Sequence, residues 1–279
     1  MRRFLIVLIL LGSPFAGERL CHFLTDGFYE SRIVTDLPNQ EIWETHIPPP
    51  EGALTQTYHY LSCGGQCFVF ESDDHQFVLK FFKHHRWKNN LLNRLRRDMV
   101  HQKKVQELTL MSVIYAIKYF HDESLVDYVH LNREGTHLPT ITCVDRIRRK
   151  HHFDLNKYQF IIQRKGCTLL DRLIERKNYK DLEGAKQDIR KSLDLLASCH
   201  HKGIKNQDPY MTRNFGFVEN TPIVIDSGAF CEYQEQNTAP LPARILERGV
   251  GNLLKWTDQY WPPLSKEIEE WTTAYYSAQ

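Results

Sequence analysis

The segment from His200 to Phe230 constrains the fold of this chain more than any other segment. An apolar helical pattern ends at Gly203, where a glycine can act as the C-cap of a helix. Two short apolar runs follow a polar loop, Asn214–Val218 and Pro222–Ile225, and the turn signal Glu219-Asn220-Thr221 separates them. The sequence therefore predicts a helix, a loop and a small hairpin in that order.

Three polar residues lie around this predicted hairpin. Asp208 is in the loop, Asn214 begins the first strand, and Asp226 follows the second strand. The hairpin would bring them together at its open end. One carboxylate that can accept a proton, together with an amide and a second carboxylate that can bind a hard cation, suits phosphoryl transfer. The alternative is that these acids only cap turns.

This segment resembles the catalytic segment of the protein-kinase-like superfamily. Leu195–Ile204 resembles the end of that family's long C-lobe helix. Asp208 takes the place of the catalytic aspartate of H-R-D, and Asp226-Ser227-Gly228 takes the place of D-F-G. The two aspartates are 18 positions apart, which is similar to the family's usual spacing.

The segment also departs from the family pattern. Asn206 and Gln207 replace the histidine and arginine that precede the catalytic aspartate. Asn214 follows Asp208 by 6 positions, one more than is usual, and Tyr210 stands where the family has a lysine. These changes leave open whether the chain is an active enzyme or a pseudokinase.

Residues 56–83 predict three strands, at 57–61, 67–70 and 77–82. The turn between the first two contains Gly64 and Gly65, and glycines in such a turn let backbone N–H groups approach a polyphosphate. This turn resembles the kinase glycine-rich loop, of which only the central glycine, Gly64, is retained. The alternative is an ordinary β-meander.

Further partial motifs follow in the order that the family has. Val78-Leu79-Lys80 resembles the strand whose lysine grips the phosphates, and Glu107, on a predicted helix at 107–120, is the candidate to pair with Lys80. Strands are expected at 138–146 and 158–163, with a basic tip between them. The stretch that follows Gln163 resembles the kinase hinge, and it leads into a short helix with an N-cap at Thr168.

The N-terminus has a basic start and an unbroken apolar run from Phe4 to Leu11. Three interpretations stay open for residues 1–17: a secretory signal peptide, a short membrane anchor, or a buried N-terminal helix. The first two predict a membrane-associated or exported protein, and the third allows a cytoplasmic one.

Composition sets limits on the partners. With 36 basic and 34 acidic residues the formal net charge is only +2, a balance that argues neither for nor against nucleic acid over the whole chain. No specific nucleic acid is expected as a partner. Residues 84–104 are locally basic and form either a solvated helix face or a surface for an anionic membrane. The 7 cysteines are scattered, which favours free thiols over a disulfide framework.

The resemblance covers about residues 56–260 and implies an α+β, bilobal protein-kinase-like fold with a small antiparallel β N-lobe and a mainly helical C-lobe. Only 51 residues follow Gly228, so the C-lobe would be reduced. The expected parts are residues 1–17 as the signal peptide or anchor, 18–55 as an N-terminal extension, 56–165 as the N-lobe and 166–279 as the C-lobe.

The resemblance implies an ATP-dependent phosphotransferase that uses Mg²⁺ or Mn²⁺. Lys80 would hold the phosphates with Glu107 orienting it, and Asn214 and Asp226 would hold the metal. Asp208 would position the acceptor hydroxyl and take its proton. The acceptor is a protein, a sugar or a small molecule. The alternative is a pseudokinase that acts as a protein-binding or nucleotide-binding module.

Overall fold

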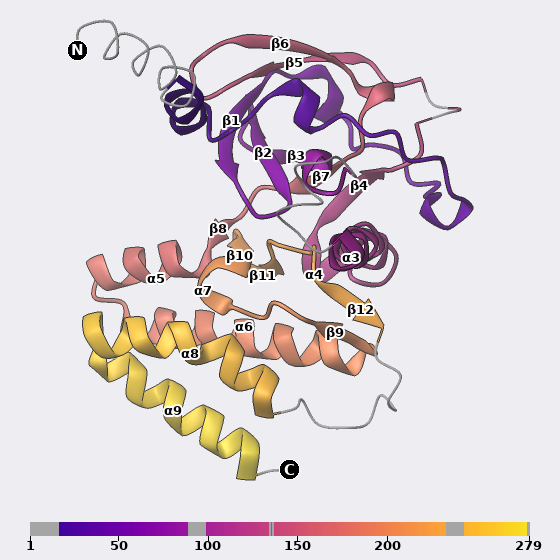
Figure 1. Cartoon of the computed structure of the whole chain (residues 1–279). Coiled ribbons are helices and arrows are strands. Elements are labelled where there is room, and N and C mark those ends of the chain that lie inside the picture. The colour runs from indigo at the N-terminus through magenta and orange to yellow at the C-terminus, as the bar shows by residue number, and fades with distance from the viewer. Residues whose placement is uncertain (1–16, 89–98, 134, 136, 233–242, 278–279) are drawn as a thin grey trace, which may run out of the picture. The chain divides into compact units, whose positions relative to one another are not determined.

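The chain forms two compact units, each built from two stretches of sequence (Figure 1). The computed structural model describes residues 17–88, 99–133, 135, 137–232 and 243–277. The first unit comprises Met1–Lys103 and His130–Ile162, and the second comprises Lys104–Val129 and Gln163–Gln279. The fold is α+β, as the sequence predicts.

The first unit is organised around a seven-stranded sheet with the strand order β4-β7-β3-β2-β1-β5-β6. Residues 126–129 of the edge strand β4 and residues 163–164 of the neighbouring β7 belong to the second unit. The strands are β1 (Tyr58–Cys63), β2 (Cys67–Ser72), β3 (Phe77–Phe82), β4 (Val126–His130), β5 (Thr140–Val144), β6 (Lys150–Asp154) and β7 (Phe160–Arg164).

The antiparallel meander β1-β2-β3 confirms the three strands predicted from residues 56–83. The sheet as a whole is mixed, because β1 pairs with β5 in parallel through Tyr58 and His59. The prediction of an antiparallel sheet is therefore wrong at this pair. The physical reason is the length of the connection, since the chain between β1 and β5 is long enough for the crossover that a parallel pair requires.

Strand β6 was not predicted, because its sequence Lys-His-His-Phe-Asp reads as part of a basic tip. It pairs with β5 in an antiparallel register from Thr140↔Asp154 to Val144↔Lys150. Phe153 is its one fully buried residue and faces the core. One large aromatic side chain in an otherwise polar strand is too weak a pattern for a prediction from sequence.

Aromatic side chains fill the core of the first unit. The ring of Phe81 makes edge contacts with Phe70, Phe153 and Tyr158, at centroid distances of 6.0, 5.4 and 5.8 Å. Phe28, from the N-terminal extension, lies 5.2 Å from the ring of Phe68 and is buried. The extension therefore contributes to the core of the first unit.

The second unit is mainly helical. Its helices are α3 (Met99–Tyr119), whose first turn begins in the first unit, α4 (His121–Ser124), α5 (Leu169–Asn178), α6 (Leu182–His201), α7 (Met211–Asn214), α8 (Ala243–Tyr260) and α9 (Pro262–Ser277). Its strands form two small sheets, in the orders β11-β10-β8 and β12-β9. These strands are β8 (Cys167–Thr168), β9 (Ile204–Asn206), β10 (Phe215–Val218), β11 (Thr221–Val224) and β12 (Phe230–Glu232).

The helix boundaries in the second unit follow from local chemistry. The Thr168 hydroxyl accepts from the Asp171 backbone N–H at 3.0 Å and caps α5, and the Asp181 carboxylate accepts from the Gly184 N–H at 2.8 Å and caps α6. Gly203 adopts φ 75° just after α6, which is the left-handed conformation that favours glycine. The predicted N-cap at Thr168 and the predicted helix end at Gly203 are confirmed.

Several predictions concern segments outside the described residues. The apolar N-terminal run lies in residues 1–16, and residues 89–98 of the basic segment 84–104 also lie outside the described part. In the part of the chain that the structure describes, no helix is both long and apolar enough to cross a membrane. All seven cysteines are free thiols, which confirms the prediction from their spacing.

Candidate functional site

The predicted hairpin exists and brings Asn214 and Asp226 to its open end. Strands β10 and β11 pair from Phe215↔Val224 to Val218↔Thr221, and the Ile225 N–H donates to the Asn214 carbonyl at 2.8 Å. Asn214 directly precedes β10, and Asp226 follows Ile225. The two residues are therefore placed by one backbone ladder, and both lie in the second unit.

Asn214 also ties this hairpin to the loop that contains Asp208. Its side chain is buried, and its Nδ2 donates to the Asp208 carbonyl oxygen at 2.8 Å. Because the amide nitrogen is used in this hydrogen bond, the amide oxygen is the ligand atom that Asn214 offers to a cation. The side chain thereby fixes the backbone of Asp208 next to the position expected for a metal.

Asp208 forms an ion pair that the sequence did not predict. Both of its carboxylate oxygens lie 3.1 Å from Nη2 of Arg213, and its side chain is 34% exposed. The Asp208 N–H donates to Oδ1 of Asn206 at 2.9 Å, which sets the loop conformation. The guanidinium of Arg213 also lies over the ring of Tyr210, 4.7 Å from its centroid.

Asp226 is exposed, and its carboxylate accepts a hydrogen bond from the backbone of the turn that it begins. Oδ1 accepts from the Gly228 N–H at 3.0 Å, and Asp226 lies at the mouth of the hairpin. Ser112 of α3 fixes the residues that follow, because its hydroxyl donates to the Ser227 carbonyl and accepts from the Phe230 N–H at 2.6 Å.

The segment after Asp226 also forms backbone hydrogen bonds with the segment that leads into Asp208. Strand β12 pairs with β9 through Phe230↔Asn206, and the Gln207 N–H donates to the Ala229 carbonyl at 2.9 Å. Within the second unit the structure thus brings together Asp208, Asn214 and Asp226.

In the first unit, Gly64 and Gly65 form the turn between β1 and β2. Nζ of Lys83 donates to the Gly64 carbonyl at 2.5 Å, and the Arg86 guanidinium donates to the Gly65 carbonyl. Lys83 also lies 4.5 Å above the ring of Phe68 and is buried. The turn therefore has two positive charges beside it, an electrostatic setting that favours a phosphate.

The remaining predicted residues lie on regular elements. Lys80 is buried in β3, opposite Val69 of β2. Glu107 is on α3 and is exposed. Lys80 belongs to the first unit and Glu107 to the second, so their pairing stays a prediction.

Three residues that contact the predicted segments were missed at the level of sequence: Lys83 in the first unit, and Ser112 and Arg213 in the second. The signal for Arg213 was its position directly before Asn214, in a segment that lacks the family's lysine at Tyr210. Lys83 follows Lys80 by 3 positions and lies between the predicted strand 77–82 and the basic segment 84–104, so it was not singled out. Ser112 gave no sequence signal, because a small polar residue on an amphipathic helix is common.

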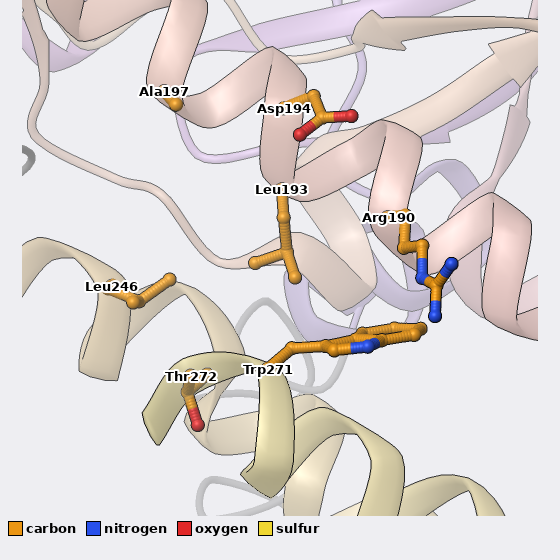
Figure 2. Close-up of a pocket in the computed structure, with 7 residues that line it drawn as sticks. All are labelled: Arg190, Leu193, Asp194, Ala197, Leu246, Trp271 and Thr272. Atoms are coloured by element: carbon orange, nitrogen blue, oxygen red, sulfur yellow. The ribbon is translucent and has the colours of Figure 1, made fainter. Parts of the chain in front are cut away.

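A pocket of about 350 Å³ lies elsewhere in the second unit, between α6, α8 and α9 (Figure 2). The Arg190 guanidinium stacks on the Trp271 ring at 4.3 Å on one side, and apolar side chains lie on the other. None of the residues predicted from sequence lines it. The lining residues are Arg190, Leu193, Asp194, Ala197, Leu246, Trp271 and Thr272.

Comparison with known proteins gives no family for this chain. No protein-family model matches the sequence, and no curated protein matches it. In the described part of the chain, no three His, Cys, Asp or Glu side chains form a metal-binding group. A magnesium ion bound through substrate phosphates needs only one or two protein ligands, so Asn214 and Asp226 still fit it.

Proposed function

We propose that this protein is a bilobal, kinase-like phosphotransferase that moves the γ-phosphate of ATP to a hydroxyl acceptor with the help of a divalent cation. The observation that supports this most is the hydrogen bond from the Asn214 side chain to the Asp208 backbone, at the open end of a hairpin that leads to Asp226. If Asp208 and Asp226 only capped turns, the buried amide of Asn214 would not be needed to connect their two segments.

Asn214, Asp226 and Asp208 would have different roles in the reaction. The amide oxygen of Asn214 and the carboxylate of Asp226 would hold Mg²⁺ or Mn²⁺, and the metal would neutralise charge on the phosphates. Asp208 would accept a hydrogen bond from the acceptor hydroxyl and take its proton. Its partly exposed carboxylate can be reached by a substrate.

Cationic residues complete the proposed site. The buried Lys80 would contact the α- and β-phosphates with Glu107 orienting it, and the turn at Gly64 and Gly65 would cover them. Arg213 would supply the positive charge that the family places at the position of Tyr210. Its guanidinium would move from Asp208 to the transferring phosphate when nucleotide is present.

The first experiment is a thermal shift of the full chain with ATP and MgCl₂. A ligand at one hundred times its Kd stabilises a protein by about 2.7 kcal/mol, so binding would be evident. Asp226→Ala should lower both the nucleotide affinity and the shift. Asp194→Ala, an exposed aspartate on α6, is the matched control and should change neither.

Turnover then tests Asp208. Phosphate transfer from ATP is measured with the protein itself, other proteins and simple sugars as acceptors. Asp208→Ala should keep the thermal shift and lose roughly 10²–10⁴ in rate. If the wild-type protein shows no shift with any nucleotide and metal, and both variants lose only stability, the acids are turn caps and the proposal fails.

The second candidate is a pseudokinase that binds a nucleotide or a protein partner. The ion pair between Arg213 and Asp208 favours it, because both oxygens of the expected base lie within 3.1 Å of a cation. In that case nucleotide would stabilise the protein without turnover. Arg213→Gln separates the two functions, since it should lower the rate of an enzyme and leave partner binding by a pseudokinase unchanged.

A further inference from the structure

Exposed apolar side chains gather on the helix formed by residues 17–25 of the first unit. Leu20, Phe23 and Leu24 share one face of this helix through their spacing of three and four positions, and they are 57%, 71% and 43% exposed. Three large apolar side chains on a single short helix face are a marker of an interaction surface.

A basic tip lies beside the C-terminal end of this helix (Figure 1). The Arg146 guanidinium donates to the Phe23 carbonyl at 3.2 Å and also pairs with Asp26. The tip joins β5 to β6, and all of residues 146–150 are exposed. Four of these five residues are cations and the fifth is an isoleucine: Arg146, Ile147, Arg148, Arg149 and Lys150.

Hydrogen bonds to the buried Asp145 fix the conformation of this tip. The buried Asp145 accepts from the backbone N–H of Ile147 at 3.0 Å and of Arg149 at 2.8 Å, and its second oxygen lies 2.9 Å from Nε2 of His151. Arg148 takes the left-handed conformation, with φ 65°, at the apex. The tip therefore presents its side chains outward in a defined arrangement, with little entropy to lose on binding.

We propose that the face formed by this helix and tip docks on an anionic phospholipid surface. Asp26 neutralises Arg146, which leaves Arg148, Arg149 and Lys150 as the net charge of the tip. Basic side chains next to exposed Leu, Phe and Ile are the combination that binds the interface of an anionic bilayer. A nucleic-acid backbone would use the cations but not the apolar face, so a membrane fits better.

This surface is distinct from the basic segment 84–104, which begins with the buried residues His84 and Trp87. It is also distinct from the apolar run at Phe4–Leu11, and it does not depend on the phosphotransferase proposal. The apolar run precedes the helix in sequence, so an attachment through it would bring the helix and the tip to the same bilayer.

Hydrogen exchange of the full chain tests this surface locally. The probes are vesicles of phosphatidylcholine alone and vesicles with about 30% phosphatidylserine, which carry a negative surface potential. Peptides that cover residues 17–26 and 144–151 should exchange more slowly with the anionic vesicles than with the neutral ones. This readout does not depend on whether residues 1–17 hold the chain to either vesicle.

Vesicle flotation of variants gives the size of the effect. Arg148→Gln with Lys150→Gln should reduce the preference for anionic over neutral vesicles by roughly 30-fold, since each basic residue near such a surface contributes about 5-fold. Lys118→Gln with Lys255→Gln removes two exposed charges elsewhere and should keep the preference. Phe23→Ala should weaken binding to the anionic vesicles by about 5-fold or more.

Two results would overturn the proposal. One is equal protection by neutral and anionic vesicles, or an anionic preference that survives the removal of Arg148 and Lys150. The other is protection of residues 144–151 by double-stranded RNA or DNA but not by phosphatidylserine, which would make the tip a nucleic-acid surface. Circular dichroism of each variant shows that any loss of binding is not a loss of fold.

Discussion

The two units of this protein are stabilised in different ways. The first has an aromatic core with buried histidines, of which His84 and His130 are 2% and 3% exposed. Burial lowers the pKa of His84 to about 3 and that of His130 to about 4, so both are neutral near pH 7. In the second unit, the buried carboxylate Asp188 lies between two arginines.

This difference connects stability to the candidate site. Nε of Arg172 donates to Asp188 at 2.8 Å, and the same guanidinium donates to the Glu219 carbonyl and to Oδ1 of Asn220 in the turn of the β10–β11 hairpin. The buried ion pair therefore supports the hairpin whose open end has Asn214 and Asp226. In the first unit, Phe81 packs against the rings of Phe70, Phe153, Tyr158 and Phe160.

The largest effect is expected in the first unit, from Phe81→Ala. Phe81 is fully buried and makes edge contacts with four aromatic rings, so its loss should cost about 3–5 kcal/mol of unfolding free energy. Urea unfolding gives the total, and hydrogen exchange shows which unit opens. Phe23→Ala, at a 71% exposed position, should change stability by less than about 0.5 kcal/mol.

A loss of about the same size is expected in the second unit from Asp188→Ala. It leaves Arg172 and Arg176 without their shared buried partner, which costs about 3–5 kcal/mol. Exchange should increase in residues 215–224 and stay unchanged in β1–β3. Asp194→Ala on the same helix is the control. Faster exchange in both units would show that the two are not separately stabilised.

Acid should act mainly on the first unit. A histidine whose folded pKa is lowered binds its proton more readily when unfolded, so stability is complete above pH about 6.5 and falls as pH drops toward 4. Between about pH 7 and pH 5 the expected loss is roughly 1–2 kcal/mol for each of His84 and His130.

Two variants test the direction in which stability changes with pH. His84→Gln should reduce the pH dependence of unfolding between about pH 5 and pH 7 by up to one proton. His46→Gln, whose side chain is 87% exposed, should leave that dependence unchanged. A first unit that is more stable at pH 5 than at pH 7 would contradict the proposed neutral state of the buried histidines.

The smallest effect is local to one helix. Thr168→Ala removes the cap of α5 and should cost about 0.5–2 kcal/mol, because the Asp171 N–H loses its acceptor. Thr273→Ala, at an exposed position of α9, should cost less. The midpoint of urea unfolding measures both variants, and equal losses would mean that the Thr168 cap adds nothing beyond helix propensity.

Regular local patterns could be predicted from the sequence. The helix that ends at Gly203, the hairpin after Asn214, the meander at residues 58–82 and the cap at Thr168 all depend on neighbouring residues. Chain order alone also suggested that Asp208, Asn214 and Asp226 meet, because a hairpin joins its own two ends. Strands β4 and β6 were missed, since β6 is largely polar and the five residues of β4 are too few to show a distinct periodicity.

Contacts between distant segments could be known only from the tertiary structure. The parallel pairing of β1 with β5, the packing of Phe28 against Phe68, and the hydrogen bonds of Ser112 with residues 227 and 230 join positions far apart in the chain. The sequence by itself determined the elements with clear local patterns, because helix and strand periodicity and turn chemistry act over a few residues. The tertiary structure decided their partners, because burial and hydrogen bonding select among many pairings that the local sequence permits equally.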